Sequence, residues 1–193
     1  MIPPEKYGMK VMSIDFLTGE ESPVIWRGPM VDKYITQLWD VVEWGALDYM
    51  VIDLPPGTGD AQLSILQSVP VTGAVVVTTP QQVAVDDARK GLKMFGKFQT
   101  PVLGIVENMS GFVCPDCGST HDIFGAGGGE AFAEESDMPF LGALPLDPRV
   151  RAGGDEGAPV VRSDTETGET FREFVRETAN MQGIVHRNRT AGR

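Results

Sequence analysis

The chain repeats a pattern in which a short apolar run precedes a longer stretch with apolar residues three or four positions apart. Runs rich in residues that favour strands lie at 10–14, 49–54, 73–79, 101–106 and 140–144. Stretches with helical spacing begin near Gly28, Asp60, Val83 and Gly129, and a last one spans 171–185. Because most residues of these runs are apolar, the pattern predicts an α/β fold whose mainly parallel sheet carries helices on both faces.

The length and the polar stretches of the chain set its expected domain organisation. With 193 residues there is room for one α/β domain. We expect residues 1–163 to form the body of that domain, with an irregular glycine-rich segment at 111–129. Residues 164–193 should add an amphipathic helix and a loose tail, joined to the body by a flexible segment at 164–169.

Acidic residues outnumber basic ones, with 27 Asp and Glu against 16 Lys and Arg and a net charge of -11. Such a charge disfavours non-specific binding to nucleic acid and to anionic membranes. The sequence has no apolar run of about 18 residues, and its first residues do not form a signal-peptide pattern. We therefore expect a cytoplasmic protein with no nucleic-acid partner and no membrane partner.

The segment 48–60 carries the first candidate site. Its apolar run ends near Asp53, and a Pro-Pro-Gly turn that ends at Gly57 follows at once, which is typical of a buried parallel strand that meets a loop. Ligands bind at that edge of open α/β sheets. An aspartate there can hold Mg²⁺ through water beside nucleotide phosphates, and the backbone N–H of Gly57 can approach a terminal phosphate. A simple turn cap is the alternative interpretation of Asp53.

The two cysteines, Cys114 and Cys117, form a Cys-Pro-Asp-Cys motif. In a reducing compartment such a pair favours metal binding or redox chemistry over a structural disulfide. Together with His121 the pair offers three zinc ligands and needs a fourth. Two thiolates supply only half of the ligands of a 4Fe-4S cluster, so a symmetric dimer would be needed to complete one.

Two further features follow the run at 101–106 and precede the helix near Gly129. The side-chain amide of Asn108 can donate to and accept from the edge of an adenine, although a lone Asn after a strand is also a common turn residue. The glycine-rich stretch 125–129 lacks the lysine of a phosphate-binding loop. We expect it to be a flexible connection near the cysteines.

Several short motifs occur in an order that matches a known family. Besides 48–60, they are Tyr7–Ser13, Trp26–Met30, Thr78–Gln81, Asp87–Gly91, Glu107–Ser110, Cys114–Cys117 and Pro145–Pro148. The chain resembles, over about residues 7–159, the Mrp/ApbC-type iron-sulfur cluster carrier ATPases, which are relatives of the ParA/MinD group of P-loop ATPases.

The resemblance implies roles for individual residues. Asp53 would organise Mg²⁺ and water, and Gly57 would sense the terminal phosphate of ATP. Asn108 would contribute to adenine recognition, with the loop that contains Pro145 and Asp147 beside the same base. Cys114 and Cys117 would hold a labile 4Fe-4S cluster between the subunits of a homodimer, for transfer to apo iron-sulfur proteins.

One motif of a P-loop ATPase is absent from these 193 residues, namely Gly-x-x-x-x-Gly-Lys-Ser/Thr. In the resembled family it lies upstream of the point that corresponds to Met1, beside the strand that ends in Asp53. The chain therefore looks like the C-terminal portion of an ATPase, incomplete at the N-terminus. We expect marginal stability on its own, because strand edges would be left unpaired, and little ATP hydrolysis.

The main hypothesis is a cluster carrier or assembly factor that is coupled to ATP binding and hydrolysis in the complete protein. The alternative is a non-catalytic module in which zinc or a cluster organises a protein interface. A positioning ATPase that acts at a membrane is disfavoured, because Arg172, Glu173, Arg176 and Glu177 mix charges on the final helix.

Overall fold

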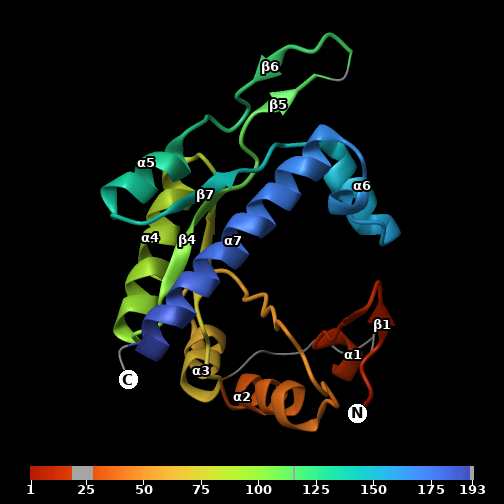
Figure 1. Cartoon of the computed structure of the whole chain (residues 1–193), viewed down its shortest axis with the longest axis vertical. Helices are drawn as coiled ribbons and strands as arrows, with labels where there is room; N and C mark the ends of the chain where they lie inside the picture. The colour runs from red at the N-terminus through yellow and green to blue at the C-terminus, as the bar shows by residue number, and fades with distance from the viewer. Residues whose placement is uncertain (19–27, 115, 192–193) are drawn as a thin grey trace. The chain divides into compact units, whose positions relative to one another are not determined.

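The computed structural model of the chain describes residues 1–18, 28–114 and 116–191. They divide into two units, Met1–Pro70 and Val71–Arg193 (Figure 1). Trp26 and Arg27 of one resemblance motif lie outside the described residues.

A three-stranded parallel sheet forms the centre of the second unit. Its order is β3 (Ala74–Thr78), β4 (Val102–Glu107) and β7 (Phe140–Ala143). The parallel register pairs Val76 with Ile105, and Val106 with Gly142. Strand β4 is central and nearly all of its residues are buried, which explains why its sequence is apolar without alternation. The predicted α/β fold with a parallel sheet is confirmed.

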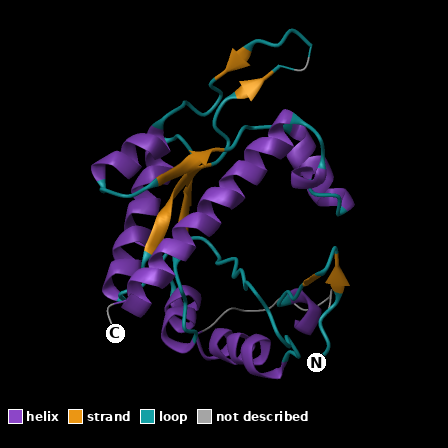
Figure 2. Ribbon diagram, viewed as in Figure 1, coloured by secondary structure: helices purple, strands orange, loops and turns teal. Residues whose placement is uncertain are grey.

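Helices cover both faces of this sheet, as Figures 1 and 2 show. Helices α4 (Gln82–Lys97) and α5 (Gly128–Glu135) lie on one face, and α7 (Glu166–Ala191) lies on the other. The core under α7 consists of strand residues packed against one stripe of the helix: Val75, Val106, Leu141, Leu144, Phe171, Phe174 and Met181. The apolar spacing of the final helix is therefore explained by packing on β4 and β7.

Two short elements join β7 to α7. Helix α6 (Pro148–Glu156) has Asp147 as its N-cap and Pro148 at its first position, a residue order that favours a helix start. A 3-10 turn at Val160–Arg162 follows. The expected joint at 164–169 is only partly correct, because α7 already begins at Glu166, where the Thr165 hydroxyl accepts a hydrogen bond from Gly168 N.

A small antiparallel hairpin stands apart from the main sheet (Figure 2). It pairs β5 (Phe112–Val113) with β6 (Thr120–His121), with Phe112 opposite His121. The sequence predicted an irregular segment at 111–129, and this is corrected to a hairpin followed by the start of α5. Runs of only two residues give too little alternation to be recognised as strands.

The first unit is mainly helical and loop-rich. Its elements are β1 (Glu5–Lys6), β2 (Met9–Lys10), α1 (Asp15–Thr18), α2 (Gly28–Thr36), a π-helical turn at Gln37–Val41 and α3 (Asp60–Ser68). Strands β1 and β2 form a hairpin whose turn places Tyr7 and Gly8 at positive φ. The helices predicted from Gly28 and Asp60 are confirmed.

Two strand predictions in the first unit are wrong. The run at 10–14 contributes only Lys10 to a strand, and residues 49–54 form no strand at all. Val51 is 92% exposed and Tyr49 is 61% exposed. Without a hydrogen-bonded neighbour, an apolar run has no ladder in which to become a strand.

Candidate functional site

The carboxyl end of β4 is built around a buried acid, Glu107, which is only 1% exposed. Its Oε1 accepts hydrogen bonds from the Ser110 hydroxyl at 2.5 Å and from Gly127 N at 3.0 Å. Its Oε2 accepts one from Gly129 N at 2.5 Å. The two glycine N–H groups lie at the start of α5, where the helix dipole favours a negative charge. The protein thus supplies its own anion to this helix terminus.

The glycine-rich stretch 125–129 is therefore not the flexible connection that we expected. A Cβ on Gly128 would collide with the carbonyl oxygen of Pro80, and a Cβ on Gly129 would lie 2.9 Å from Glu107 Cβ. Gly127 has a φ of 77°, in the left-handed region that glycine adopts most easily. These glycines are needed for close packing of the α5 N-terminus against the ends of β3 and β4.

Asn108 follows Glu107 and is half-buried at the same strand end. Its backbone N–H donates to Thr78 O at 2.7 Å, and its Oδ1 accepts from Met109 N at 2.9 Å. The Oδ1 is thus used in the local turn, while the Nδ2 has no hydrogen-bond partner among the described residues. The side chain keeps donor capacity for a ligand.

The loop after β7 lies beside the loop that contains Asn108. Ser110 N donates to Leu144 O at 2.9 Å, and Leu146 N donates to Gly111 O at 2.9 Å. The structure therefore brings Asn108 and the loop of Pro145 and Asp147 to the same edge of the sheet. This is the edge at which open parallel sheets bind ligands.

Asp147 itself is engaged in holding two helices. Its Oδ1 caps α6 by accepting from Arg149 N at 2.8 Å, and its Oδ2 accepts from the buried Thr167 hydroxyl of α7 at 2.5 Å. The Arg149 guanidinium lies 2.6 Å from Oδ2. Hydrogen bonds from this guanidinium, and then from Thr167, hold the pKa of Asp147 at about 2, below its usual 3.8. The Arg149 guanidinium is therefore held in an ion pair with Asp147.

Cys114 and Cys117 lie in the turn of the β5–β6 hairpin, and both are free thiols. Cys114 N donates to Ser119 O at 2.9 Å, and Gly118 N donates to Cys114 O at 2.9 Å. These bonds close a tight turn that exposes Cys117 and leaves Cys114 half-buried.

The thiol of Cys117 contacts neighbouring polar groups. Its Sγ lies 3.3 Å from the Ser119 hydroxyl oxygen. Hydrogen bonds from the side chain and backbone of Ser119, and then from the Cys114 side chain, lower the pKa of the Cys117 thiol. Both thiols therefore lie in one short turn, with Cys117 exposed and Cys114 half-buried.

The hairpin offers two cysteine ligands and not three ligands of mixed type. No group of three or more His, Cys, Asp or Glu side chains suited to a metal ion occurs in residues 1–18, 28–114 and 116–191. His121 lies in β6, where its backbone is opposite Phe112 of β5. Cys114, Cys117 and His121 are therefore not gathered as three ligands here, and two thiols per chain fit half of a four-cysteine cluster site.

Asp53 and Gly57 lie in the first unit, in the loop before α3. Asp53 is exposed, in contrast to the predicted buried strand end. Gln62, which is 2% exposed, donates from Nε2 to Pro55 O at 2.6 Å. Gly57 has a φ of 93°, a conformation that favours glycine. The N-cap of α3 is Gly59, so Asp60 is the first helical residue and does not cap the helix.

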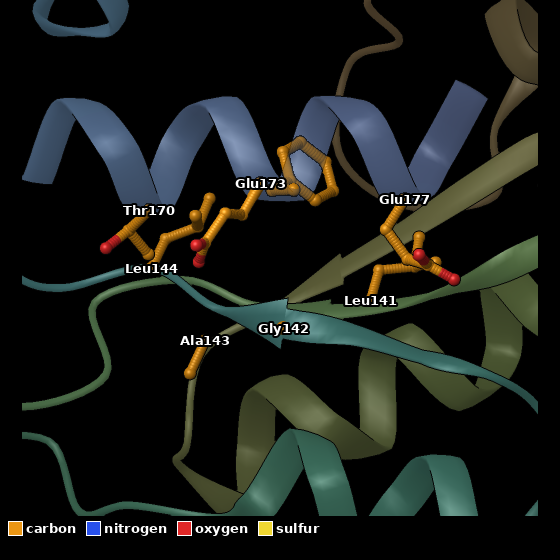
Figure 3. Close-up of a pocket in the computed structure, with 8 residues that line it drawn as sticks. Leu141, Gly142, Ala143, Leu144, Thr170, Glu173 and Glu177 are labelled. Carbon is orange, nitrogen blue, oxygen red and sulfur yellow. The ribbon is translucent and has the colours of Figure 1, made fainter. Parts of the chain in front are cut away.

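A shallow cavity of about 300 Å³ lies between β7 and α7. It is lined by Leu141, Gly142, Ala143, Leu144, Thr170, Glu173, Phe174 and Glu177. Figure 3 shows Thr170, Glu173 and Glu177 extending from α7 toward β7. Two carboxylates without a basic side chain in the lining disfavour a phosphate ligand here. None of the residues that the sequence predicted for a cluster, Mg²⁺ or nucleotide site lines this cavity.

Sequence reasoning missed three residues of these sites. Glu107 was noted only as the first residue of the motif Glu107–Ser110, although a charged residue directly after the apolar run 101–106 signals a buried acid that needs donors. Ser119 and Thr167 gave no signal, because single hydroxyl residues in polar segments are common. Their contacts depend on tertiary structure.

Within the part of the chain that the structure describes, no helix has the length and apolar character needed to cross a bilayer.

Comparison with known proteins places these features in a family. The model of a ParA-type family, described as NUBPL iron-transfer P-loop NTPase, matches residues 1–179. An iron-sulfur cluster carrier protein of Synechocystis is 54% identical over 83% of this chain and 46% of its own length. One from Methanocaldococcus jannaschii is 50% identical over 89% of this chain and 60% of its own length. The chain thus spans about half the length of the curated relatives that it matches.

A solved structure agrees with the sequence comparison. The nucleotide-binding protein of Archaeoglobus fulgidus in complex with ADP is 38% identical and superposes with a TM-score of 0.68. The match covers 81% of this chain and 61% of that protein. This chain belongs to the NUBPL iron-transfer P-loop NTPase family of ParA-type proteins.

Proposed function

We propose that this chain is the cluster-binding and base-binding portion of an iron-sulfur cluster carrier. The observation that carries the proposal is the pair of free thiols, Cys114 and Cys117, in the turn of a hairpin that stands apart from the sheet. An accessible pair can receive a cluster and give it to another protein. The relatives named as cluster carriers support the same function.

The cargo of this carrier is a 4Fe-4S cluster that is shared by two copies of the chain. Each hairpin supplies two thiolates, and four are required. The hairpin also exposes Val113, with 58% of its surface accessible, and Ile123 follows with 56%. Apolar side chains beside the thiols favour contact with a second copy, which would also shield the cluster from water.

The nucleotide partner is ATP with Mg²⁺, bound by the complete protein. Asn108 would donate to the adenine from its Nδ2, and the loop of Pro145 and Asp147 would line the base. Asp53 would organise Mg²⁺ through water, and Gly57 would offer its backbone N–H to the terminal phosphate. The positive φ of Gly57 supports this role, because it turns the backbone in a way that other residues rarely adopt.

The recipients are apo iron-sulfur proteins, and the compartment is the cytoplasm. Free thiols are kept reduced there, and a thiolate is the form that binds iron. The lowered pKa of Cys117 favours that form.

The test is anaerobic transfer of a reconstituted cluster to an apo 4Fe-4S protein, followed by the activity of the acceptor. We expect Cys114→Ser and Cys117→Ser to abolish both cluster retention and transfer. The matched control is His121→Ala, which changes a potential ligand in the same hairpin and should leave transfer intact. Loss of metal in His121→Ala, with zinc instead of iron in the wild type, would favour the metal-binding module instead.

A further inference from the structure

The buried carboxylate of Glu107 connects parts of the second unit that are far apart in sequence. Its three hydrogen bonds come from Ser110, just after β4 ends, and from Gly127 and Gly129, where α5 begins. The hairpin that carries the cysteines lies between these two points. The Glu107 side chain therefore links the two ends of the segment that carries Cys114 and Cys117.

The same residue is part of the strand end that faces the proposed base site. Glu107 O accepts from Leu144 N at 2.7 Å, and the next residue, Asn108, donates from its N–H to Thr78 O. Ser110, which bonds the Glu107 carboxylate through its hydroxyl, also donates from its N–H to Leu144 O. A displacement of Asn108 or of the loop after Leu144 must therefore move atoms that hold Glu107.

The surroundings of Glu107 leave little room for independent movement. Gly129 has its Cα so close that an added Cβ would lie 2.9 Å from Glu107 Cβ and 3.1 Å from Thr78 Cγ2. Glu107 and Thr78 are themselves 1% and 4% exposed. In such a packed site a shift at one end is transmitted to the neighbouring element.

We propose that Glu107 is a positioning residue that couples nucleotide binding at the Asn108 edge to the geometry of the Cys114–Cys117 hairpin. This proposal rests on the proposed function and adds the link between its two sites. A carboxylate suits this role because both of its oxygens accept, and all three of its partners donate. A glutamine would turn an NH2 group toward one of these donors, so at least one of the three hydrogen bonds would be lost.

The experiment measures how Mg-ADP changes the rate at which iodoacetamide modifies the cysteines of the cluster-free protein at its full natural length. In the wild type we expect bound Mg-ADP to change that rate by about fivefold or more, the usual lower range of coupling between two sites. The ratio of the modification rates with and without Mg-ADP should fall to near one in Glu107→Gln. The Kd of this variant for Mg-ADP should stay within about threefold of the wild-type value. A residue with only a structural role would lower stability and leave the ratio unchanged.

Two further variants make the result decisive. Glu130→Gln removes an exposed carboxylate in the first turn of the same helix α5 and should keep the wild-type ratio. Ser110→Ala removes one of the three hydrogen bonds and should reduce the ratio partially, which decides the matter if Glu107→Gln does not fold. The proposal is overturned if the wild type binds Mg-ADP without a change in thiol reactivity, or if Glu107→Gln or Ser110→Ala keeps the full ratio.

Iron and acid-labile sulfide are measured in parallel on the reconstituted wild type. If the cluster binds but the ratio is one, the coupling is wrong and the carrier function stands. If no cluster binds, the carrier function is wrong, whatever the ratio.

Discussion

Two segments of this chain have similar apolar compositions and different structures. Residues 49–54 and β4 are both apolar runs of about six residues with an acid at or next to the end. In β4, Ile105 is 0% exposed and Val106 is 1% exposed, and Glu107 is buried with three donors. In 49–54, Val51 is 92% exposed, Ile52 is 37% exposed, and Asp53 lies at the surface.

The difference shows that an apolar run becomes a strand only where neighbours complete it. Strand β4 has β3 on one side and β7 on the other, so its backbone groups are paired along its length. The run at 49–54 has no strand partner among the described residues. A buried backbone without partners is costly, so the run stays exposed to water.

The largest difference in stability is expected when an isoleucine is replaced by alanine in each of the two segments. Ile105→Ala removes a fully buried side chain next to β3 and β7, and should lower the free energy of unfolding by about 2 to 5 kcal/mol. Ile52→Ala should change it by less than about 0.5 kcal/mol. Urea denaturation of the 193-residue chain measures both. Equal losses for the two variants would show that 49–54 is a buried strand after all.

The sequence was sufficient for elements whose signal is local or repeated. The strands β3, β4 and β7 and the helices α3, α4, α5 and α7 follow from apolar periodicity. The hairpin of β5 and β6 could not be predicted, because its two-residue strands are fixed by the turn at Gly118 and by backbone bonds of Cys114. The failure at 49–54 has the opposite cause, since that run has the right composition and lacks the partner.

The candidate site shows the same division. Cys114 and Cys117 were proposed as cluster ligands because they form a Cys-x-x-Cys pair, and Asn108 was proposed as an adenine-binding residue from the family resemblance. Glu107 was missed because its role depends on Gly127 and Gly129, which come from a different part of the chain. Contacts between distant residues need the fold before they can be seen.

An intermediate difference in stability is expected when the carboxylates of Glu107 and Asp53 are each replaced by an amide. Glu107→Gln should lower the free energy of unfolding by roughly 1 to 3 kcal/mol, because a buried donor is left without an acceptor. Asp53→Asn should leave stability within about 0.5 kcal/mol, because the side chain is exposed. Thermal or urea denaturation at neutral pH compares them. If only Asp53→Asn lost much stability, Asp53 would be the buried, hydrogen-bonded acid and Glu107 the exposed one.

The smallest effect concerns a third acid, Asp147, in the loop between β7 and α6. Because its pKa is about 2 in the folded chain, below 3.8, its pairing with Arg149 and Thr167 stabilises the fold at pH values above its ordinary pKa. That stabilisation is lost as the pH falls through about 2. Asp147→Asn keeps a good N-cap and should cost about 1 kcal/mol at neutral pH.

The pH dependence provides the control for that variant. The difference in urea midpoint between wild type and Asp147→Asn should shrink as the pH is lowered from 5 towards the folded pKa of about 2. A difference that stays constant over this range would mean that the carboxylate charge of Asp147 does not contribute.

The central claim is that two copies of the Cys114–Cys117 hairpin hold one cluster. Native mass spectrometry of the anaerobically reconstituted protein, combined with iron and sulfide analysis, tests it most directly. We predict a dimer with one 4Fe-4S cluster, which corresponds to about two iron atoms and about two sulfides per chain. A monomer that binds zinc and contains no acid-labile sulfide would contradict the claim.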